Sequence, residues 1–105
     1  MASKLTDNAY LLLTALAEGQ NHGYALARRV GEITSGEVAI GAGTLYSNLD
    51  RLLAEGLIVE AGEEIVDGRA RRNYRISQSG TREIVERVQQ LRLQVDAMNA
   101  ALRLA

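Results

Sequence analysis

The spacing of hydrophobic residues predicts three helices in the first half of the chain. Apolar side chains recur at the spacing that places them on one side of a helix over three segments, residues 5–17, 24–33 and 42–55. Thr6 or Asp7 is suited to cap the start of the first helix, and Asn21 or His22 the start of the second. Gly56 follows the third helix, where a left-handed glycine commonly ends a helix. We therefore expect three helices joined by short connections.

The third predicted helix has one bulky side and one slender side. Its leucines fall within an arc of about 100°, which is the width of a stripe that faces a core; they are Leu45, Leu49, Leu52 and Leu53. The opposite arc carries mostly small or polar side chains, namely Gly43, Thr44, Ser47, Asp50, Arg51 and Ala54. A helix with such a slender side can fit into a narrow groove.

After Gly56 the apolar pattern becomes that of short strands. Residues 57–60 and 73–76 are rich in residues that favour strands, and Asp67-Gly68 between them is a strong signal for a type I′ hairpin turn. We refer to this hairpin as the wing. Because only two strands are visible, we expect a two-stranded sheet that depends on the helices for its stability.

The remainder of the chain predicts one long helix over residues 78–104, capped by Ser77 or Ser79. Its apolar residues are separated alternately by four and three positions, which is a heptad seam; they are Ile84, Val88, Leu91, Val95, Met98 and Leu102. The helix is about 40 Å long at 1.5 Å per residue, longer than a body of this size covers. The seam therefore predicts a homodimer. The first helix is apolar on more than one side, so we expect Leu12 to join this contact.

The charge of the chain is unevenly distributed. The net charge is −1 over 105 residues, which argues against a generally basic nucleic-acid binder. Residues 50–67 hold six acids against one base, whereas residues 68–82 hold five arginines and no acid. A local cationic patch is therefore predicted at the wing.

The residues that would support catalysis or metal binding are missing. The chain contains no cysteine, and His22 is its only histidine, so capping or packing is favoured for His22 over metal binding or acid–base chemistry. No catalytic triad or phosphate-binding loop is present, so we expect a protein that is not an enzyme and needs no cofactor. No membrane-spanning run and no secretion signal is visible, which predicts a cytoplasmic location.

The order of the predicted elements is that of a winged helix-turn-helix: mainly α, with a two-stranded β wing and a long carboxy-terminal dimerisation helix. We expect residues 1–77 to form the DNA-binding part and residues 78–105 the dimerisation helix. In this fold the third helix enters the major groove, which is about 12 Å wide and barely admits a helix. The slender side of residues 42–55 meets that requirement.

These motifs resemble those of the PadR family of transcriptional regulators, in particular its short type with a single carboxy-terminal helix. The resemblance covers roughly residues 5–82 and is carried by His22-Gly23-Tyr24, Gly43-Thr44-Leu45-Tyr46, Glu55-Gly56-Leu57-Ile58, Asp67-Gly68-Arg69 and Tyr74-Arg75-Ile76-Ser77. Ser47 stands where the family usually has proline, and the chain lacks the tryptophan that well-known drug-binding members use.

The resemblance implies a homodimeric repressor that binds an inverted-repeat operator in double-stranded DNA and is released by a small aromatic or drug-like effector. The candidate DNA contacts are Tyr24, Arg28, Gly43, Thr44, Tyr46, Ser47, Asn48, Arg51, Arg69, Arg71 and Arg72. Among the wing arginines, strand alternation makes Arg75 the exception.

Each of these features also has a purely structural interpretation. Tyr46 could pack at the boundary of the core, Arg51 could pair with nearby acids, and the wing arginines could form an ordinary solvated hairpin. A winged-helix protein-interaction module is therefore an alternative function, favoured by the overall acidic surplus and opposed by the localised arginines. Small-molecule binding is a third function, and it is compatible with DNA binding.

Overall fold

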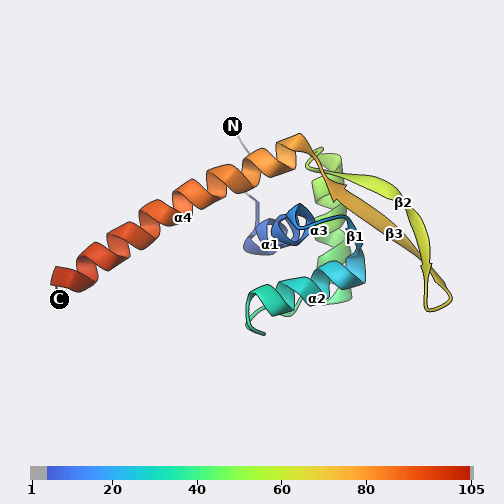
Figure 1. The fold of residues 1–105 in the computed structure, drawn as a ribbon, viewed down its shortest axis with the longest axis horizontal. Coiled ribbons are helices and arrows are strands. Elements are labelled where there is room, and N and C mark those ends of the chain that lie inside the picture. The colour runs from blue at the N-terminus through green and yellow to red at the C-terminus, as the bar shows by residue number, and fades with distance from the viewer. Residues whose placement is uncertain (1–4, 105) are drawn as a thin grey trace.

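Four helices and three strands make up residues 5–104, the part of the chain that the computed structural model describes (Figure 1). In chain order they are α1 (Asp7–Ala17), β1 (Asn21–His22), α2 (Gly23–Ile33), α3 (Ala42–Ala54), β2 (Ile58–Val66), β3 (Arg69–Ile76) and α4 (Gln78–Leu104). Helices α1, α2 and α3 form the body, the β2–β3 wing extends from one side, and α4 extends away from the other (Figure 1). The molecule is accordingly long, with extents of 57 × 31 × 22 Å.

Polar side chains cap three of the helices, as the sequence predicts. Thr6 Oγ1 accepts a hydrogen bond from the Ala9 N–H at 3.1 Å. His22 Nδ1 accepts one from the Ala25 N–H at 3.4 Å, so the single histidine caps α2. Ser77 Oγ accepts from the Gly80 N–H at the start of α4. Each cap satisfies a backbone donor that the helix itself leaves without a partner.

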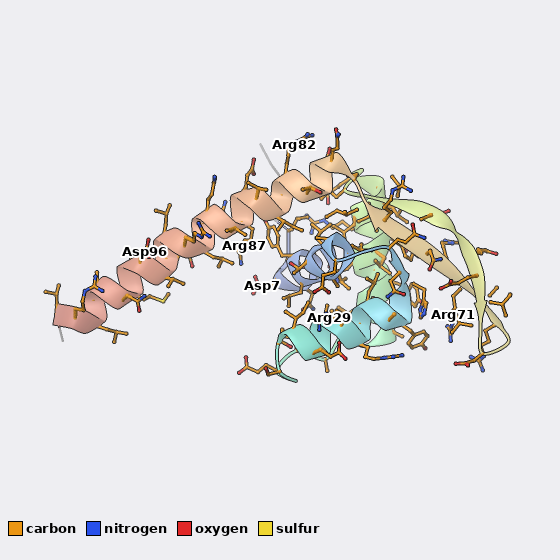
Figure 2. All side chains as sticks on the ribbon, viewed as in Figure 1. Asp7, Arg29, Arg71, Arg82, Arg87 and Asp96 are labelled. Carbon is orange, nitrogen blue, oxygen red and sulfur yellow. The ribbon has the colours of Figure 1, made fainter. Side chains whose placement is uncertain are left out.

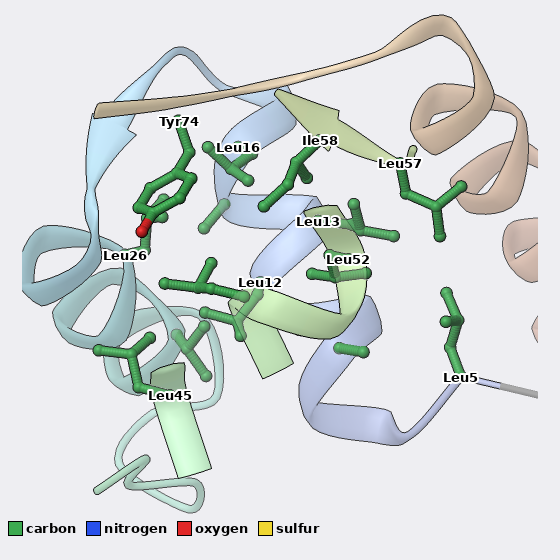
Figure 3. Close-up of a cluster of buried hydrophobic side chains, with 14 residues drawn as sticks. Leu5, Leu12, Leu13, Leu16, Leu26, Leu45, Leu52, Leu57, Ile58 and Tyr74 are labelled. Carbon is green, nitrogen blue, oxygen red and sulfur yellow. The ribbon is translucent and has the colours of Figure 1, made fainter. Parts of the chain in front are cut away.

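The core lies where α1, α2 and α3 meet beneath the base of the sheet (Figure 3). The side chains with the least exposure include Leu12, Leu13, Leu16, Leu26, Val30, Leu45, Leu49, Leu52 and Ile58. The prediction that Leu12 lies at a dimer contact is wrong, because its side chain is 0% exposed within the single chain. The apolar residues that α1 leaves partly exposed are Tyr10 and Leu11 instead.

The sheet has three antiparallel strands in the order β1-β3-β2, so the expected two-stranded sheet gains a strand. The added strand β1 pairs Asn21 with Tyr74 and His22 with Asn73. Two residues are too few to show strand alternation, which is why β1 has no sequence signal. The predicted hairpin turn is confirmed: Asp67 and Gly68 have φ values of 52° and 76°, the two positive values that a type I′ turn requires.

Helix α4 is almost wholly exposed beyond its first turns. Gly80 is its one buried residue among those described, and Ile84 packs partly against the core. The other members of the predicted seam are exposed, with exposed fractions between 41% for Val88 and 71% for Leu102. None of the described helices is long and apolar enough to cross a membrane.

Gly80 joins α4 to the sheet so closely that a larger residue does not fit. An added Cβ would overlap the carbonyl oxygen of Leu57 and come within 2.7 Å of Ile76 Cγ1. We predict that Gly80→Ala lowers the free energy of unfolding by about 1–3 kcal/mol, the usual cost of overpacking. Gly43→Ala is the matched control, because a Cβ there meets open space. Urea unfolding of both variants is the test, and equal destabilisation would contradict the prediction.

Candidate nucleic-acid interface

The slender side of α3 faces outward, as predicted. Gly43, Thr44, Ser47 and Asp50 are exposed, while Leu45, Leu49 and Leu52 on the other side are at most 1% exposed. Gly41 occupies the N-cap and makes no side-chain hydrogen bond to the first turn. The exposed side therefore presents small side chains, hydroxyls and unoccupied N–H groups, which a nucleic acid can approach closely.

Two further candidate contacts on α3 are engaged within the chain. The Asn48 amide nitrogen donates to the Thr44 carbonyl at 2.8 Å, and its oxygen accepts from Thr6 Oγ1 at 3.0 Å. Arg51 Nε lies 2.9 Å from Glu55 Oε2, in the pairing that the structural interpretation expects. Both pairs are near the surface, so they hold these side chains at the exposed edge of α3 without burying them.

Tyr46 lies where α3 meets the start of α2. Its side chain is 40% exposed, and a Cβ added at Gly23 would lie 3.3 Å from its hydroxyl oxygen. Tyr46 is one of the residues that line a cleft of about 380 Å³ between α3, the start of α2 and the wing. The cleft is lined by both signs of charge, including Asp50, Glu63, Arg71 and Arg72. Tyr46 thus packs against the start of α2 and remains partly exposed.

The charges that are separated along the sequence meet again in the wing. The register places Glu63 opposite Arg72 and Glu64 opposite Arg71. Arg72 also forms a salt bridge to Glu60, with 3.2 Å between Nη1 and Oε1. The wing is therefore less cationic than the run of arginines suggests, because β2 supplies acids beside the arginines of β3.

The wing arginines differ in what they contact. Arg69 follows the turn and is exposed, and its side chain has no hydrogen bond or salt bridge to any residue in the described range. The Arg71 guanidinium carbon lies 4.7 Å from the centre of the Tyr24 ring. Figure 2 shows Arg71 between α2 and the wing. Arg69 is therefore the arginine of the wing that is best placed to reach an outside anion.

Helix α2 contributes a second free cation. Tyr24 is half exposed, and Arg28 lies one turn further along the same helix with no salt bridge to any described residue. Its neighbour Arg29 is bound instead to Glu18 at 2.7 Å and to Glu32 at 3.2 Å. The hydrogen bond from Arg29 lowers the pKa of the Glu18 carboxyl. Arg29 is therefore occupied, and Arg28 is the cation that α2 can offer to a ligand.

A second cleft lies at the junction of α1 and α4. Arg87 of α4 pairs with Asp7 at 3.1 Å and lies 4.7 Å from the centre of the Tyr10 ring. The cleft has a volume of about 310 Å³ and is lined by Asp7, Tyr10, Leu11, Thr14, Val38, Arg87 and Leu91. Sequence reasoning missed the contacts of Arg87, because Asp7 lies 80 positions away in the chain and no local pattern links the two.

An exposed slender helix, a neighbouring helix that supports it and a wing with a free arginine define a winged helix-turn-helix protein of the kind that regulates transcription. The chain matches the family model described as the transcriptional regulator PadR-like family over residues 12–86. The chain belongs to this family. Its members are transcriptional regulators and not enzymes, which agrees with the expectation from the sequence.

Known proteins are similar to the chain in sequence and in fold. Transcriptional regulator Rv3488 of Mycobacterium tuberculosis is 37% identical over 75 residues, which cover 71% of this chain and 66% of that protein, slightly less than two thirds. A PadR family regulator from Clostridium difficile is 26% identical with a TM-score of 0.76, over 90% of this chain and 96% of that one.

A second similar structure was solved with DNA bound. Bacillus subtilis PadR, in complex with operator DNA, is 21% identical with a TM-score of 0.69, over 81% of this chain and 48% of that one. At this level of identity the likeness concerns the fold. It places the chain among the winged-helix structures of its family.

Arg72 also acts on the buried hydroxyl of Tyr74. Burial raises the pKa of that hydroxyl, while the positive charge of Arg72 and a hydrogen bond from it lower the pKa. We predict that Arg72→Gln raises the pKa of Tyr74 further, because both lowering effects are weakened. Arg75→Gln, on the other face of β3, is the control and leaves this pKa unchanged. Ultraviolet titration of the phenolate is the measurement, and a lower pKa in Arg72→Gln would contradict the prediction.

Proposed function

We propose that the protein is a cytoplasmic homodimer that binds an inverted-repeat operator and represses transcription. The observation that carries this proposal is the exposed, slender side of α3 beside a wing with a free arginine. An α-helix fills the major groove almost completely, so a side without bulk allows its backbone to approach the bases. The fold shared with Bacillus subtilis PadR, which was solved with operator DNA, supports the proposal.

In the proposed complex α3 is the recognition helix. Thr44 and Ser47 are exposed hydroxyls on its outer side, and Asn48 and Arg51 stand at its edge. The Arg51 guanidinium can exchange its exposed pairing with Glu55 for a pair of acceptors on guanine, since surface ion pairs contribute little stability. Gly43 adds no bulk, so the first turn can come close to a phosphate.

Phosphates would be contacted on both sides of α3. Arg69 is available from the wing, and Arg28 with the hydroxyl of Tyr24 is available from α2. Tyr46, which lines the cleft between α3, α2 and the wing, would add a hydroxyl. Such contacts fix the register of a protein on the duplex and carry no sequence information, whereas the side chains of α3 read the bases.

The second copy of the chain would cover the exposed seam of α4. Val88, Leu91, Val95, Met98 and Leu102 line one side of a helix that projects beyond the body (Figure 1). A two-fold contact along this seam places two recognition helices on one face of the dimer. Half-sites about 34 Å apart would then be read together, which corresponds to one turn of DNA.

The cleft between α1 and α4 is where we propose that a small aromatic effector binds. It joins the body to the dimerisation helix and combines apolar walls with the Tyr10 ring and the Arg87 guanidinium. A ligand there would change the angle between α4 and the body. The separation of the two recognition helices would change with it, which releases the operator.

DNA binding can be tested on a labelled duplex that carries the sequence upstream of the gene. We predict that affinity falls steeply with salt, and that Arg69→Ala reduces the slope of log K against log salt by about 0.9, the value for one lost phosphate contact. Arg51→Ala should instead relax discrimination at one base position by about 1–3 kcal/mol. Fluorescence anisotropy at several salt concentrations measures both effects. A wild-type protein that binds no duplex, even at low salt, would favour a protein-interaction module.

Dimerisation can be tested by placing a charge in the seam. We predict that Val95→Asp produces a monomer, because its side chain lies in the middle of the proposed contact, where a carboxylate would be buried without a partner. Leu93→Asp is the control, since Leu93 lies two positions away on the opposite side of α4 and is 72% exposed. Sedimentation at micromolar concentration distinguishes the states. A monomeric wild-type protein would refute the proposed dimer.

A further inference from the structure

The first turn of α2 touches both elements that the proposed function assigns to DNA. Gly23 lies against the Tyr46 side chain of α3, close enough that an added Cβ would be 3.3 Å from the hydroxyl oxygen. The next residue, Tyr24, carries the Arg71 guanidinium of the wing 4.7 Å from its ring centre. Two consecutive residues of one helix therefore set the position of α3 and of the wing relative to each other.

The wing contacts the start of α2 at two places. One is the β1–β3 pairing near the base of the wing, and the other is the stacking of Arg71 on the Tyr24 ring. The two pairs between β1 and β3 hold Asn73 and Tyr74, both of which are buried. Arg71 lies two residues closer to the tip, and beyond it Asp67, Gly68 and Arg69 are all exposed. The stack of Arg71 on Tyr24 is thus placed where it can fix the direction in which the tip points.

The guanidinium of Arg71 is arranged for packing. Its Nε atom is buried and has no hydrogen-bond partner. Glu64 stands opposite it in the register, but no salt bridge joins the two. A cation within about 6 Å of an aromatic centre is attracted by the ring, and the attraction grows when water is excluded. Arg69, by contrast, is exposed and stacks on no aromatic ring of the described residues.

We propose that Arg71 is a positioning residue that fixes the angle of the wing through the Tyr24 ring, whereas Arg69 makes the phosphate contact. This inference rests on the proposed DNA-binding function. Arg69 is about 7 Å further along the strand at 3.4 Å per residue. A tilt of the wing at Arg71 therefore moves Arg69 relative to α3. Arg69 of the wing then cannot contact a phosphate while α3 contacts the bases of the same duplex.

The free protein provides a test that is independent of DNA. We expect the Tyr24 ring to shift the resonance of the Arg71 Nε proton upfield, and a fixed wing to give high order parameters for its amides. We expect Tyr24→Leu to abolish the upfield shift and to lower the order parameters of residues 63–70. Tyr24→Phe keeps the ring and should retain both signals. If the two variants give the same spectra for Arg71 and for the wing, the proposal is overturned.

DNA affinity provides the second test, again by comparing Tyr24→Leu with Tyr24→Phe, since both lack the hydroxyl. We expect Tyr24→Leu to bind the upstream duplex about 3- to 10-fold more weakly than Tyr24→Phe, the range that a cation–π contact supports, with the same salt slope. Arg71→Gln should cost less in the Tyr24→Leu background than in wild type. If Arg71→Gln lowers the salt slope as much as Arg69→Ala, Arg71 contacts phosphate and does not position the wing.

The outcomes separate this inference from the function on which it rests. If the wild-type protein binds no DNA, the proposed function is refuted. The spectra of the free protein still decide whether Tyr24 and Arg71 fix the wing. If Tyr24→Leu and Tyr24→Phe bind DNA with equal affinity, the proposed function stands and the positioning role of Arg71 is refuted. Thermal unfolding of each variant checks that the fold is intact, as expected for a half-exposed tyrosine.

Discussion

Burial of one leucine stripe of α3 is the constraint on which the rest of the structure depends. Leu45, Leu49 and Leu52 are held against α1 and α2, which leaves the opposite side of the helix on the surface. Each fully buried leucine stabilises the fold by roughly 1.5–3 kcal/mol relative to an exposed one. The same contacts that stabilise the domain therefore fix the orientation of the side that meets DNA in the proposed function. In the proposed function, stability and DNA recognition use opposite sides of one helix.

Opposite charges that are far apart in the sequence are neighbours in the folded wing. The acids of residues 50–67 and the arginines of residues 68–82 form two blocks along the chain, but the hairpin places Glu63 and Glu64 beside Arg72 and Arg71. Net charge within a segment is therefore a poor guide to its surface potential when an antiparallel partner has the opposite sign. What remains available is the individual cation that forms no salt bridge with any described residue, as at Arg69 and Arg28.

The sequence predicts those features that repeat or that need a special backbone. Helix α4 is predicted as one long helix because its heptad seam persists from Ile84 to Leu102, and the turn at Asp67-Gly68 is predicted because few residues adopt positive φ there. Strand β1 is too short for a pattern. Leu12 was open to misassignment because α1 is apolar on several sides, and periodicity does not say which side meets the core of its own chain. The stack of Arg71 on Tyr24 depends on tertiary geometry.

The start of α1 contacts two other helices through adjacent residues, its N-cap Thr6 and its first residue Asp7. Thr6 donates a hydrogen bond to Asn48 on α3, and Asp7 pairs with Arg87 on α4. Only one peptide unit separates these attachments, and that unit is planar and stiff. A movement of α4 relative to the body therefore changes the position of Asp7, and the neighbouring Thr6 holds the Asn48 amide at the edge of α3. The position of the long helix and the position of that amide are thus coupled through two adjacent residues of the chain.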